Sequence, residues 1–422
     1  MPAPVHAPAG ISTIQVPRRF VTDSWGGTET TVLETSRALA AAGHPTRIFT
    51  SLALSAECRA SLRGIEVRRF DYCYPFLGLD DAERADMDLK GGNLLSLELL
   101  RNLIREPGVD LLHAHSGKRL GGIVRTAALL RRIPYVVTLH GGVFDVPVSE
   151  TNDLAAPTRG KLEWGKPLGL LLGSRRVLTD AAAVICVGRS EYDAARAMLP
   201  NQRVEFMSNG VDPGRFAEGD GAAFRRTLNI PSTAQVVLCL GRIDPQKNQL
   251  TLAQAFPSVL AAAPDAHLVL VGPVTRPAYA ARIRAEIEAM GLAGRVHLVP
   301  PIGPDSQSLA DAFHAADVFC LPSIHEPFGI VVLEAWAAGR PVVAARVGGI
   351  PGFVRDGSDA LLVEPESPDS IAASIIGLLR DPARRQAIGE AGRVRAYSEF
   401  NWQSIGARMA ALYGDVVGRR NR

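Results

Sequence analysis

The sequence predicts an α/β fold made of two doubly wound domains of similar size. The chain has 422 residues, of which 47% are hydrophobic, so each half can bury a core of its own. Short β-branched segments alternate with helical patterns along the whole length, which is typical of parallel sheets covered by helices on both faces. The strand segments are continuously apolar, as expected of strands that are buried on both sides.

Six strands are expected in the first half, with helical stretches between them. The strands are residues 11–16, 47–50, 111–114, 135–139, 184–187 and 204–207, and the helices are residues 28–42, 94–105, 122–132 and 168–181. The second half repeats this alternation. Its strands are residues 236–240, 267–271, 296–298, 318–321, 341–344 and 361–363, and its helices are residues 250–262, 278–290, 309–316, 331–338 and 370–379. A separate helical pattern follows at 400–416.

The boundary between the domains is expected at residues 209–214. Asn209-Gly210 and Asp212-Pro213 are turn signals, and a charged, glycine-rich stretch follows them. Ligands of open parallel sheets bind outside the carboxyl ends of the strands, so two facing sheets would place a ligand cleft between them. The expected domains are residues 1–208 and 209–398, followed by a final helical segment, 399–422.

Charge and cysteine usage exclude several classes of protein. The 46 basic and 43 acidic side chains give a net charge of +3, which offers no support for nucleic-acid binding, because that usually needs a concentrated basic field; a local basic patch is not excluded. Most of the paired arginines are expected on the surface. They are Arg18-Arg19, Arg68-Arg69, Arg131-Arg132 and Arg175-Arg176. The five cysteines are scattered and form no C-x-x-C pair, which favours a reducing compartment. Residues 1–10 do not resemble a signal peptide, and the apolar run at 168–172 is too short to span a membrane. We expect a cytoplasmic protein.

Two cations follow the expected strand at 236–240. Arg242 and Lys247 lie five positions apart in the segment Gly241–Asn248. A diphosphate leaving group is stabilised by such charges, because its negative charge grows as the bond to the sugar breaks. Arginine can donate hydrogen bonds to two oxygens at once, whereas lysine acts as a point charge. The alternative is a pair of solvated loop charges.

Two carboxylates frame the loop after the strand at 318–321. Glu326 precedes the expected helix, and Glu334 is expected about two turns into it. Carboxylates accept hydrogen bonds from vicinal hydroxyls, so sugar and ribose are natural partners. Gly329 allows close approach of a ligand, and the start of the helix suits phosphate oxygens. The alternative is a capping glutamate and a surface glutamate.

Glycines and histidines occupy the strand ends of the first domain. Gly26-Gly27 lies between the first strand and the first helix, where backbone amides can face an anion or a sugar, although no G-x-G-x-x-G pattern is present. His113 and His115 end one strand and His140 follows the next. His140 is interpreted as a contact to the sugar, with a structural histidine as the alternative.

A metal site is not predicted. His-x-His at His113 and His115 could suggest metal, but no third ligand is evident. Asp86-Met87-Asp88 spells D-x-D, yet it lies within the charged stretch 80–90 and not at a strand end.

Together these motifs resemble the retaining glycosyltransferases of family four, which have the GT-B architecture of two facing Rossmann-like domains. The resemblance covers nearly the whole chain, and the order and spacing of the motifs make it specific. The motifs are Gly26-Gly27-Thr28-Glu29, Thr138-Leu139-His140-Gly141, Asn209-Gly210-Val211-Asp212, Gly241-Arg242 with Lys247-Asn248, Glu326-Pro327-Phe328-Gly329 with Glu334-Ala335, and Gly339-Arg340-Pro341-Val342-Val343 with Gly348-Gly349.

The resemblance implies a role for each site residue. Arg242 and Lys247 would hold the donor diphosphate, Glu326 and His140 the transferred sugar, and Glu334 the nucleotide ribose. The remaining donor contacts would come from Gly26, Gly27, Gly241, Phe328, Gly329, Ile330 and Val331. It also implies transfer of a hexosyl group with retention of configuration, in which the leaving phosphate oxygen helps to deprotonate the acceptor. No metal or cofactor is implied, the nucleotide sugar being a co-substrate.

The substrates are less defined. Gly352 follows Pro351 where the family commonly has Pro-Glu, and Ala360 stands where glycine is common, so the identity of the donor stays open, with a UDP-sugar favoured. The acceptor is an unknown hydroxyl compound, and a lipid-linked acceptor would bring peripheral membrane contact. Its candidate contacts are His115, Lys118, Phe144, Trp164 and Lys166.

Three alternatives remain. A sugar-nucleotide epimerase would bind the same donor. A phosphorylase would need a pyridoxal lysine, yet Lys247 is the only lysine after Lys166. The third is a non-catalytic sugar-nucleotide sensor of the same fold.

Overall fold

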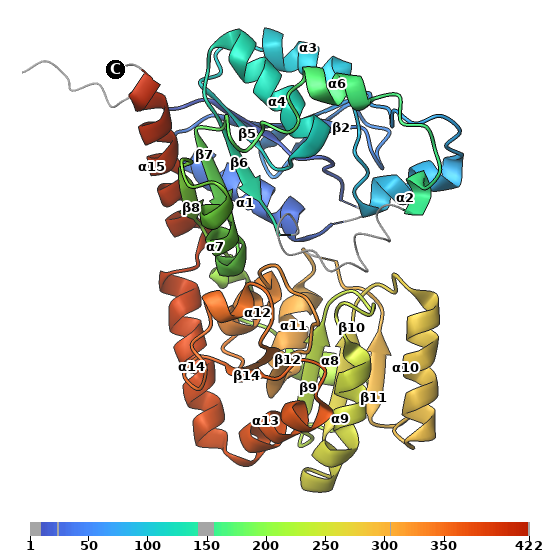
Figure 1. The fold of residues 1–422 in the computed structure, drawn as a ribbon. Coiled ribbons are helices and arrows are strands. Elements are labelled where there is room, and N and C mark those ends of the chain that lie inside the picture. The colour runs from blue at the N-terminus through green and yellow to red at the C-terminus, as the bar shows by residue number, and fades with distance from the viewer. Residues whose placement is uncertain (1–9, 23–24, 142–155, 304, 421–422) are drawn as a thin grey trace, which may run out of the picture. The chain divides into compact units, whose positions relative to one another are not determined.

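The protein divides into two compact units. The computed structural model describes residues 10–22, 25–141, 156–303 and 305–420. Unit 1 comprises residues 1–187, 191–208 and 402–422, and unit 2 comprises residues 188–190 and 209–401. Each unit is built on one twisted sheet with helices on both faces, as the sequence predicts (Figure 1).

Unit 1 contains an eight-stranded sheet in the order β3-β4-β2-β1-β5-β6-β7-β8. All neighbours are parallel except β3 and β4. The strands are β1 (Thr13–Val16), β2 (Thr46–Ser51), β3 (Arg59–Leu62), β4 (Ile65–Phe70), β5 (Leu111–Ala114), β6 (Tyr135–Leu139), β7 (Ala183–Cys186) and β8 (Val204–Phe206).

The antiparallel hairpin of β3 and β4 was missed by the sequence analysis. β3 is an edge strand whose side chains alternate between exposed and half-buried, so it lacks the continuous apolar run by which the other strands were recognised. The turn between the two strands places Arg63 and Gly64 at φ values of 48° and 85°. Arginine is not a usual turn signal at such a position.

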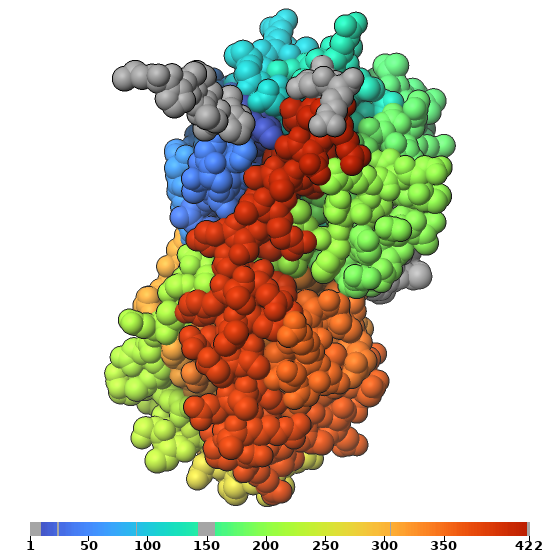
Figure 2. All heavy atoms as spheres, turned by 90° about the vertical axis from the view of Figure 1, so that its left-hand side faces the viewer, coloured from blue at the N-terminus to red at the C-terminus, as the bar shows by residue number. Residues whose placement is uncertain are grey.

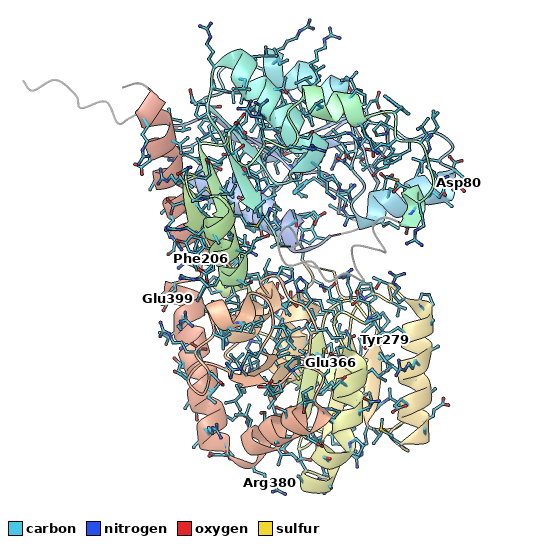
Figure 3. The ribbon with its side chains drawn as sticks, in the orientation of Figure 1. Asp80, Phe206, Tyr279, Glu366, Arg380 and Glu399 are labelled. Carbon is cyan, nitrogen blue, oxygen red and sulfur yellow. The ribbon has the colours of Figure 1, made fainter. Side chains whose placement is uncertain are left out.

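Seven α-helices are described in or bordering unit 1. They are α1 (Gly27–Ala41), α2 (Asp81–Lys90), α3 (Leu97–Arg105), α4 (Lys118–Arg131), α6 (Lys166–Leu171), α7 (Arg189–Met198) and α15 (Trp402–Arg420). The expectation of a helix over 168–181 is wrong, because α6 ends at Leu171. Gly173 adopts a φ of 63°, and the Ser174 N–H returns to the Gly169 carbonyl over 2.9 Å, which closes the helix. Helix α2 is fixed by a capping box in which Asp80 (Figure 3) and Glu83 bond reciprocally.

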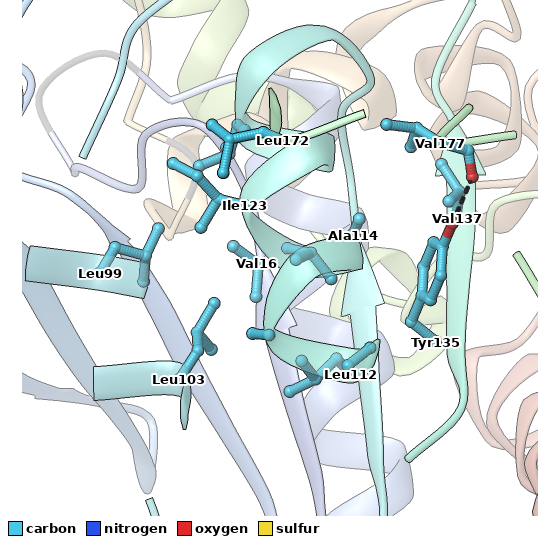
Figure 4. Close-up of a cluster of buried hydrophobic side chains, with 14 of the residues drawn as sticks. Val16, Leu99, Leu103, Leu112, Ala114, Ile123, Tyr135, Val137, Leu172 and Val177 are labelled. Carbon is cyan, nitrogen blue, oxygen red and sulfur yellow. Dashed lines mark hydrogen bonds between the residues drawn. The ribbon is translucent and has the colours of Figure 1, made fainter. Parts of the chain in front are cut away.

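The core of unit 1 lies between the sheet and helices α3 and α4. Figure 4 shows Leu99 and Leu103 of α3 facing Val16, Leu112 and other strand residues. Each fully buried leucine or valine contributes about 1.5–3 kcal/mol to stability. At the margin of this cluster the Tyr135 hydroxyl donates to the Val177 carbonyl over 2.8 Å.

Helix α15 completes the opposite side of unit 1. It forms a ridge on the face seen in Figure 2, and its residues Ile405 and Tyr413 are buried with Leu39 of α1 in one apolar cluster. Gly406 allows close approach, since a Cβ there would lie 2.5 Å from the Ala38 Cβ.

Unit 2 contains a six-stranded parallel sheet in the order β11-β10-β9-β12-β13-β14. All six predicted strands are present, with ends within one residue of the expectation. They are β9 (Val236–Leu240), β10 (His267–Val271), β11 (Val296–Val299), β12 (Val318–Leu321), β13 (Val342–Ala345) and β14 (Leu361–Val363). Cys239 and Cys320 lie buried in this sheet as small hydrophobic residues, and Cys186 does the same in unit 1.

Seven α-helices accompany this sheet. They are α8 (Gly221–Thr227), α9 (Gln249–Ala262), α10 (Pro277–Ala289), α11 (Gln307–Ala315), α12 (Ile330–Ala337), α13 (Pro368–Arg380) and α14 (Pro382–Ser398). Helices α8 and α14 were not expected. Tyr279 of α10 (Figure 3) accepts a 3.0 Å hydrogen bond from the Leu250 N–H, which satisfies one amide in the first turn of α9.

Both sheets contain a topological switch point. In unit 2 the chain adds β10 and β11 on one side of β9 and then β12, β13 and β14 on the other. In unit 1 the same reversal occurs between β1 and β5. Loops at the carboxyl ends of the two strands at a switch point diverge and leave room for a ligand. Among the described helices, none is both long enough and apolar enough to cross a bilayer.

Candidate active site

The candidate donor site lies at the switch point of unit 2. Strands β9 and β12 are adjacent, so the loops that follow them meet. The Ile324 N–H donates to the Gln246 carbonyl over 2.8 Å, and Gln246 Nε2 donates to the His325 carbonyl over 3.2 Å. These bonds join the predicted cationic loop to the predicted carboxylate loop.

Lys247 and Glu326 form an ion pair across these loops. Lys247 Nζ lies 2.5 Å from Glu326 Oε2, and Ser323 Oγ approaches the same oxygen at 3.2 Å. Glu326 is only 7% exposed. The pair brings a cation suited to phosphate next to a carboxylate suited to hydroxyl groups.

Arg242 is the more exposed cation of the site, since 51% of its side chain is accessible. Its guanidinium donates to Gln246 Oε1 over 2.8 Å and lies 3.4 Å from Asp244 Oδ2. Asp244 is buried and also accepts from the Lys247 N–H over 3.1 Å. Asp244 therefore shapes the loop, and sequence reasoning had given it no role.

The start of α12 offers backbone donors. Gly329 has a φ of 92°, a conformation that favours glycine, and no side chain caps the helix. The amides of Ile330 and Val331 begin the helix, where a phosphate would be stabilised. The Phe328 ring is buried and stacks on Phe353 with ring centroids 4.6 Å apart, so this side chain is not available to a ligand.

The motif Gly348-Gly349 supports the carboxylate loop. The Gly349 N–H donates to the Glu326 carbonyl over 2.9 Å. A Cβ at Gly348 would lie 2.1 Å from the Glu326 carbonyl oxygen, and one at Gly349 would lie 2.1 Å from that of Pro327. Only glycine fits against this backbone.

Glu334 is half-buried in α12. It is the fifth residue of the helix, one turn in and not two as expected from the sequence. Burial raises the pKa of Glu334 to about 7, while the positive charge of Arg215 acts in the opposite direction. Near neutral pH the side chain is therefore present both as acid and as carboxylate.

Three histidines of unit 1, His113, His115 and His140, lie in one cluster. His115 Nδ1 is 2.9 Å from His140 Nε2, and His113 stacks on His115 with ring centroids 4.2 Å apart. Burial lowers the pKa of His140 to about 4 and that of His113 to about 3, so both rings are neutral near pH 7. Within the described residues, no group of three or more histidine, cysteine or acidic side chains is arranged to hold a metal ion.

The glycine turn lies at the start of α1. Gly26 is the N-cap residue and Gly27 is the exposed first residue of the helix, which has no side-chain cap. Burial raises the pKa of Glu29 in this turn, while Arg19, 3.3 Å away, opposes the shift.

The acceptor-side candidates are spread over unit 1. Lys118, Trp164 and Lys166 are exposed, and Lys118 has an unusual φ of 55° at the start of α4. Both ring nitrogens of His115 are bonded within the protein, so none is left for an acceptor. Phe144 lies outside the described residues.

Arg18 was missed by the sequence analysis. It follows β1 at the switch point and is half-buried, whereas the sequence suggested a surface position. Its guanidinium donates to the Asp88 carbonyl over 2.6 Å and to the Tyr74 hydroxyl over 3.4 Å. Among the described residues no carboxylate lies within ion-pairing distance of Arg18. Burial lowers its pKa, which reflects the cost of this desolvated charge.

Asp88 has a structural role. Its carboxylate accepts hydrogen bonds from the hydroxyls of Tyr72 and Tyr74, each over 2.7 Å. The second aspartate of the D-x-D pattern at residues 86–88 is therefore hydrogen-bonded to two tyrosines.

Two family models match the chain. Residues 26–210 match the glycosyl transferase 4-like domain, and residues 220–395 match the glycosyl transferases group 1. Residue for residue, the chain is 33% identical to a D-inositol 3-phosphate glycosyltransferase of Thermobispora bispora, over 94% of this chain and 91% of that protein. It is 32% identical to D-inositol 3-phosphate glycosyltransferase 2 of Catenulispora acidiphila, over 93% and 90% of the two chains.

Solved structures share the fold. The Anabaena protein Alr3699/HepE in complex with UDP has a TM-score of 0.71 at 19% identity, covering 96% of this chain and 100% of that one. Sucrose-phosphate synthase of Thermosynechococcus elongatus has a TM-score of 0.72 at 24% identity, covering 97% and 100%. These proteins have the GT-B fold, with two Rossmann-like domains. The chain therefore belongs to the group 1 glycosyltransferases of family four and is a glycosyltransferase.

Proposed function

We propose that this enzyme transfers a hexosyl group from a nucleotide diphosphate sugar to a hydroxyl of a phosphorylated polyol, with retention of configuration and without a metal ion. A UDP-sugar is the favoured donor. Membership of a glycosyltransferase family favours transfer over the epimerase, phosphorylase and sensor alternatives.

The observation that carries the proposal is the pairing of Lys247 with Glu326 at the switch point of unit 2. A nucleotide sugar has an anionic diphosphate bonded directly to a ring rich in hydroxyls. A cation and a carboxylate in contact suit these two parts of one ligand. Arg242 and the first amides of α12 add donors for the diphosphate. Glu334, one turn further on, would accept from the ribose hydroxyls.

The same arrangement supports the proposal that no metal is needed, and retention is proposed from the resemblance to the retaining family. Two cations and a helix N-terminus can neutralise the diphosphate, which in other enzymes is the task of a divalent ion. For retention, the acceptor attacks on the face from which the diphosphate leaves. Its proton then passes to the departing phosphate oxygen, so no protein base is needed. His140, neutral near pH 7, would contact a sugar hydroxyl.

The acceptor class rests on the relatives and on Arg18. Two relatives are named D-inositol 3-phosphate glycosyltransferases, and the enzyme seen in one structural neighbour is bound to UDP. Arg18 is a desolvated guanidinium without an ion-pair partner among the described residues, and a phosphate monoester would supply one. The exposed Lys118 would add charge for the same group.

A substrate panel tests the proposal. UDP-glucose, UDP-N-acetylglucosamine, GDP-mannose and ADP-glucose would each be incubated with inositol, inositol phosphates and uncharged sugars, and the products identified by mass spectrometry. NMR of the new anomeric centre reports retention or inversion. Transfer to a phosphorylated polyol from a UDP-sugar is expected. An inverted product, or transfer only to unphosphorylated acceptors, would overturn the corresponding part of the proposal.

We also propose a cytoplasmic location, on the basis of the cysteines. All five cysteines are free, and Cys58 and Cys73 are exposed, as is common in a reducing compartment.

A further inference from the structure

A buried chain of hydrogen bonds connects α15 with His140 inside unit 1. Gln15 Nε2 lies 3.1 Å from the Tyr413 hydroxyl, and Gln15 Oε1 lies 2.8 Å from His115 Nε2. His115 Nδ1 in turn lies 2.9 Å from His140 Nε2. On the other branch the Tyr413 hydroxyl lies 2.6 Å from His113 Nδ1. Gln15 and Tyr413 are fully buried.

The direction of each hydrogen bond follows from one backbone carbonyl. The Thr46 hydroxyl donates to the His44 carbonyl over 3.0 Å, so it can only accept from the Thr13 hydroxyl at 3.2 Å. Because the Thr13 hydroxyl donates its only proton to Thr46, it can only accept from Gln15, whose Nε2 lies 3.5 Å from Thr13 Oγ1. An amide nitrogen therefore faces Thr13 and Tyr413, and the amide oxygen of Gln15 faces His115.

The same reasoning fixes the histidine tautomers. Gln15 Oε1 only accepts, so His115 must carry its proton on Nε2 and accept at Nδ1. His140 must then donate from Nε2, which leaves its Nδ1 unprotonated. Tyr413 accepts from Gln15 and donates to His113 Nδ1. His113 accordingly donates from Nε2 to the Thr138 hydroxyl, 2.6 Å away.

We propose that Gln15 and Tyr413 are positioning residues, which hold His115, and through it His140, as the tautomer with its proton on Nε2. His140 then presents an acceptor nitrogen, Nδ1, to a hydroxyl of the donor sugar. The link to catalysis rests on the proposed role of His140, whereas the tautomer itself can be measured without substrate. An unprotonated nitrogen selects a hydroxyl partner and repels the lone pairs of a phosphate oxygen.

The surroundings keep this chain of bonds uncharged. Among the described residues, the titratable groups around His115 and His140 include His113 of β5, Tyr413 of α15, which bonds to His113, and Glu191 of α7. Glu191 accepts from the Gly141 N–H over 3.1 Å. Burial is the main influence on the pKa of His115 and of His140, which it lowers in both, and within the described part of the chain no carboxylate offsets it. Both rings therefore stay neutral across the physiological range.

The experiment compares the wild-type enzyme with Tyr413→Phe, Gln15→Glu and a control, Tyr135→Phe. Tyr135 is also a buried tyrosine of unit 1, but its hydroxyl bonds only to the Val177 carbonyl. Nitrogen-15 NMR of labelled histidine distinguishes protonated from unprotonated ring nitrogens. His115→Gln and His140→Gln assign the signals. The wild type and Tyr135→Phe are expected to show His115 and His140 protonated at Nε2.

Each variant changes the chain of bonds in a distinct way. Tyr413→Phe removes the closer of the two acceptors of the Gln15 amide nitrogen and leaves only Thr13 at 3.5 Å, so we expect mixed tautomers and a loss of about tenfold in kcat/KM. In Gln15→Glu the new carboxylate raises the pKa of His115. The His115 cation donates from both nitrogens, so His140 must move its proton to Nδ1. In this variant the acid limb of the pH profile of kcat/KM therefore shifts to higher pH, and activity returns when the pH is raised.

Two outcomes would overturn the inference. One is a wild-type His140 protonated at Nδ1. The other is Tyr413→Phe with wild-type tautomers and wild-type kinetics. If the tautomers are as stated and change in both variants while kcat/KM stays constant, the positioning device exists but His140 has no role at the sugar. That result would count against the proposed function of His140 alone.

Discussion

Lys247 Nζ lies 2.5 Å from Glu326 Oε2, so the cation expected to hold the diphosphate is paired with the carboxylate expected to hold the sugar. Because Glu326 is nearly fully buried, the lysine also compensates its charge. Stability and the proposed catalytic role therefore depend on the same two side chains, and the two effects must be separated by experiment.

Lys247→Ala should reduce both activity and stability, whereas the double variant Lys247→Met/Glu326→Gln should recover stability only. The single change leaves a buried carboxylate unpaired, at a cost of up to about 3–5 kcal/mol, while the double change leaves no charge uncompensated. Thermal unfolding and single-turnover kinetics measure the two effects. Equal stability of the single and double variants would show that the ion pair does not stabilise the fold.

Arg242→Ala should lower kcat by about 100- to 1000-fold with little change in unfolding temperature. Its exposed guanidinium contributes little to packing but would stabilise the charge that grows on the diphosphate. Arg393→Ala is the matched control, because Arg393 is an exposed arginine of α14 paired with Glu390. A folded Arg242→Ala enzyme with activity near that of the control would exclude the assigned role.

Affinity for the free nucleotide should rise as the pH increases through about 7. The pKa of Glu334 is raised to about 7, and only the carboxylate can accept from both ribose hydroxyls. Below that pH the group is mainly protonated and must lose its proton for UDP to bind. Calorimetric titration of UDP between pH 5.5 and 8.5 measures this, with Glu334→Gln expected to remove the dependence. A profile that Glu334→Gln leaves unchanged would assign the titration to another group.

Activity should persist after complete chelation of divalent ions. Arg242, Lys247 and the start of α12 already provide positive potential for the diphosphate. The assay compares initial rates before and after dialysis against EDTA, with metal content measured by mass spectrometry. Loss of activity that Mg²⁺ or Mn²⁺ restores would contradict the proposed mechanism.

Arg18→Met should raise KM for a phosphorylated acceptor at least about tenfold, because it removes a charge-assisted hydrogen bond in a desolvated site. KM for the donor should not change. The unphosphorylated polyol serves as the control acceptor, and the ratio of kcat/KM between the two acceptors is the informative quantity. If Arg18→Met lowers both values in proportion, Arg18 has a structural role and does not bind phosphate.

The sequence was most informative where strands are buried on both faces. All strands of unit 2 were predicted within one residue, because continuous apolar runs such as residues 267–271 have no other simple explanation. The edge strand β3 and the short helix α6 were not predictable in this way, since one is half exposed and the other ends in a local glycine turn. The ligand cleft expected between the two domains stays a prediction.

The individual candidate residues were easier to predict from the sequence than the contacts between them. Arg242 and Glu326 are recognisable from their positions after strands, but the pairing of Lys247 with Glu326 spans 79 residues and depends on β9 lying next to β12. Arg18 was overlooked because a pair of arginines usually indicates solvent exposure. Its burial depends on Tyr74 and on the carbonyl of Asp88, which are distant in sequence.

The position of α15 has a consequence for how the protein is made. Unit 2 is almost one continuous stretch of chain, whereas unit 1 requires α15, which the ribosome synthesises after all of unit 2. Until then Leu39 and Leu111 lack the apolar surface of Ile405 and Tyr413 that covers them in the native protein. The usual order of folding during synthesis, from the first domain to the last, is therefore reversed here. The unit that emerges first finishes last, and its incomplete core is the species that chaperones would need to protect during translation.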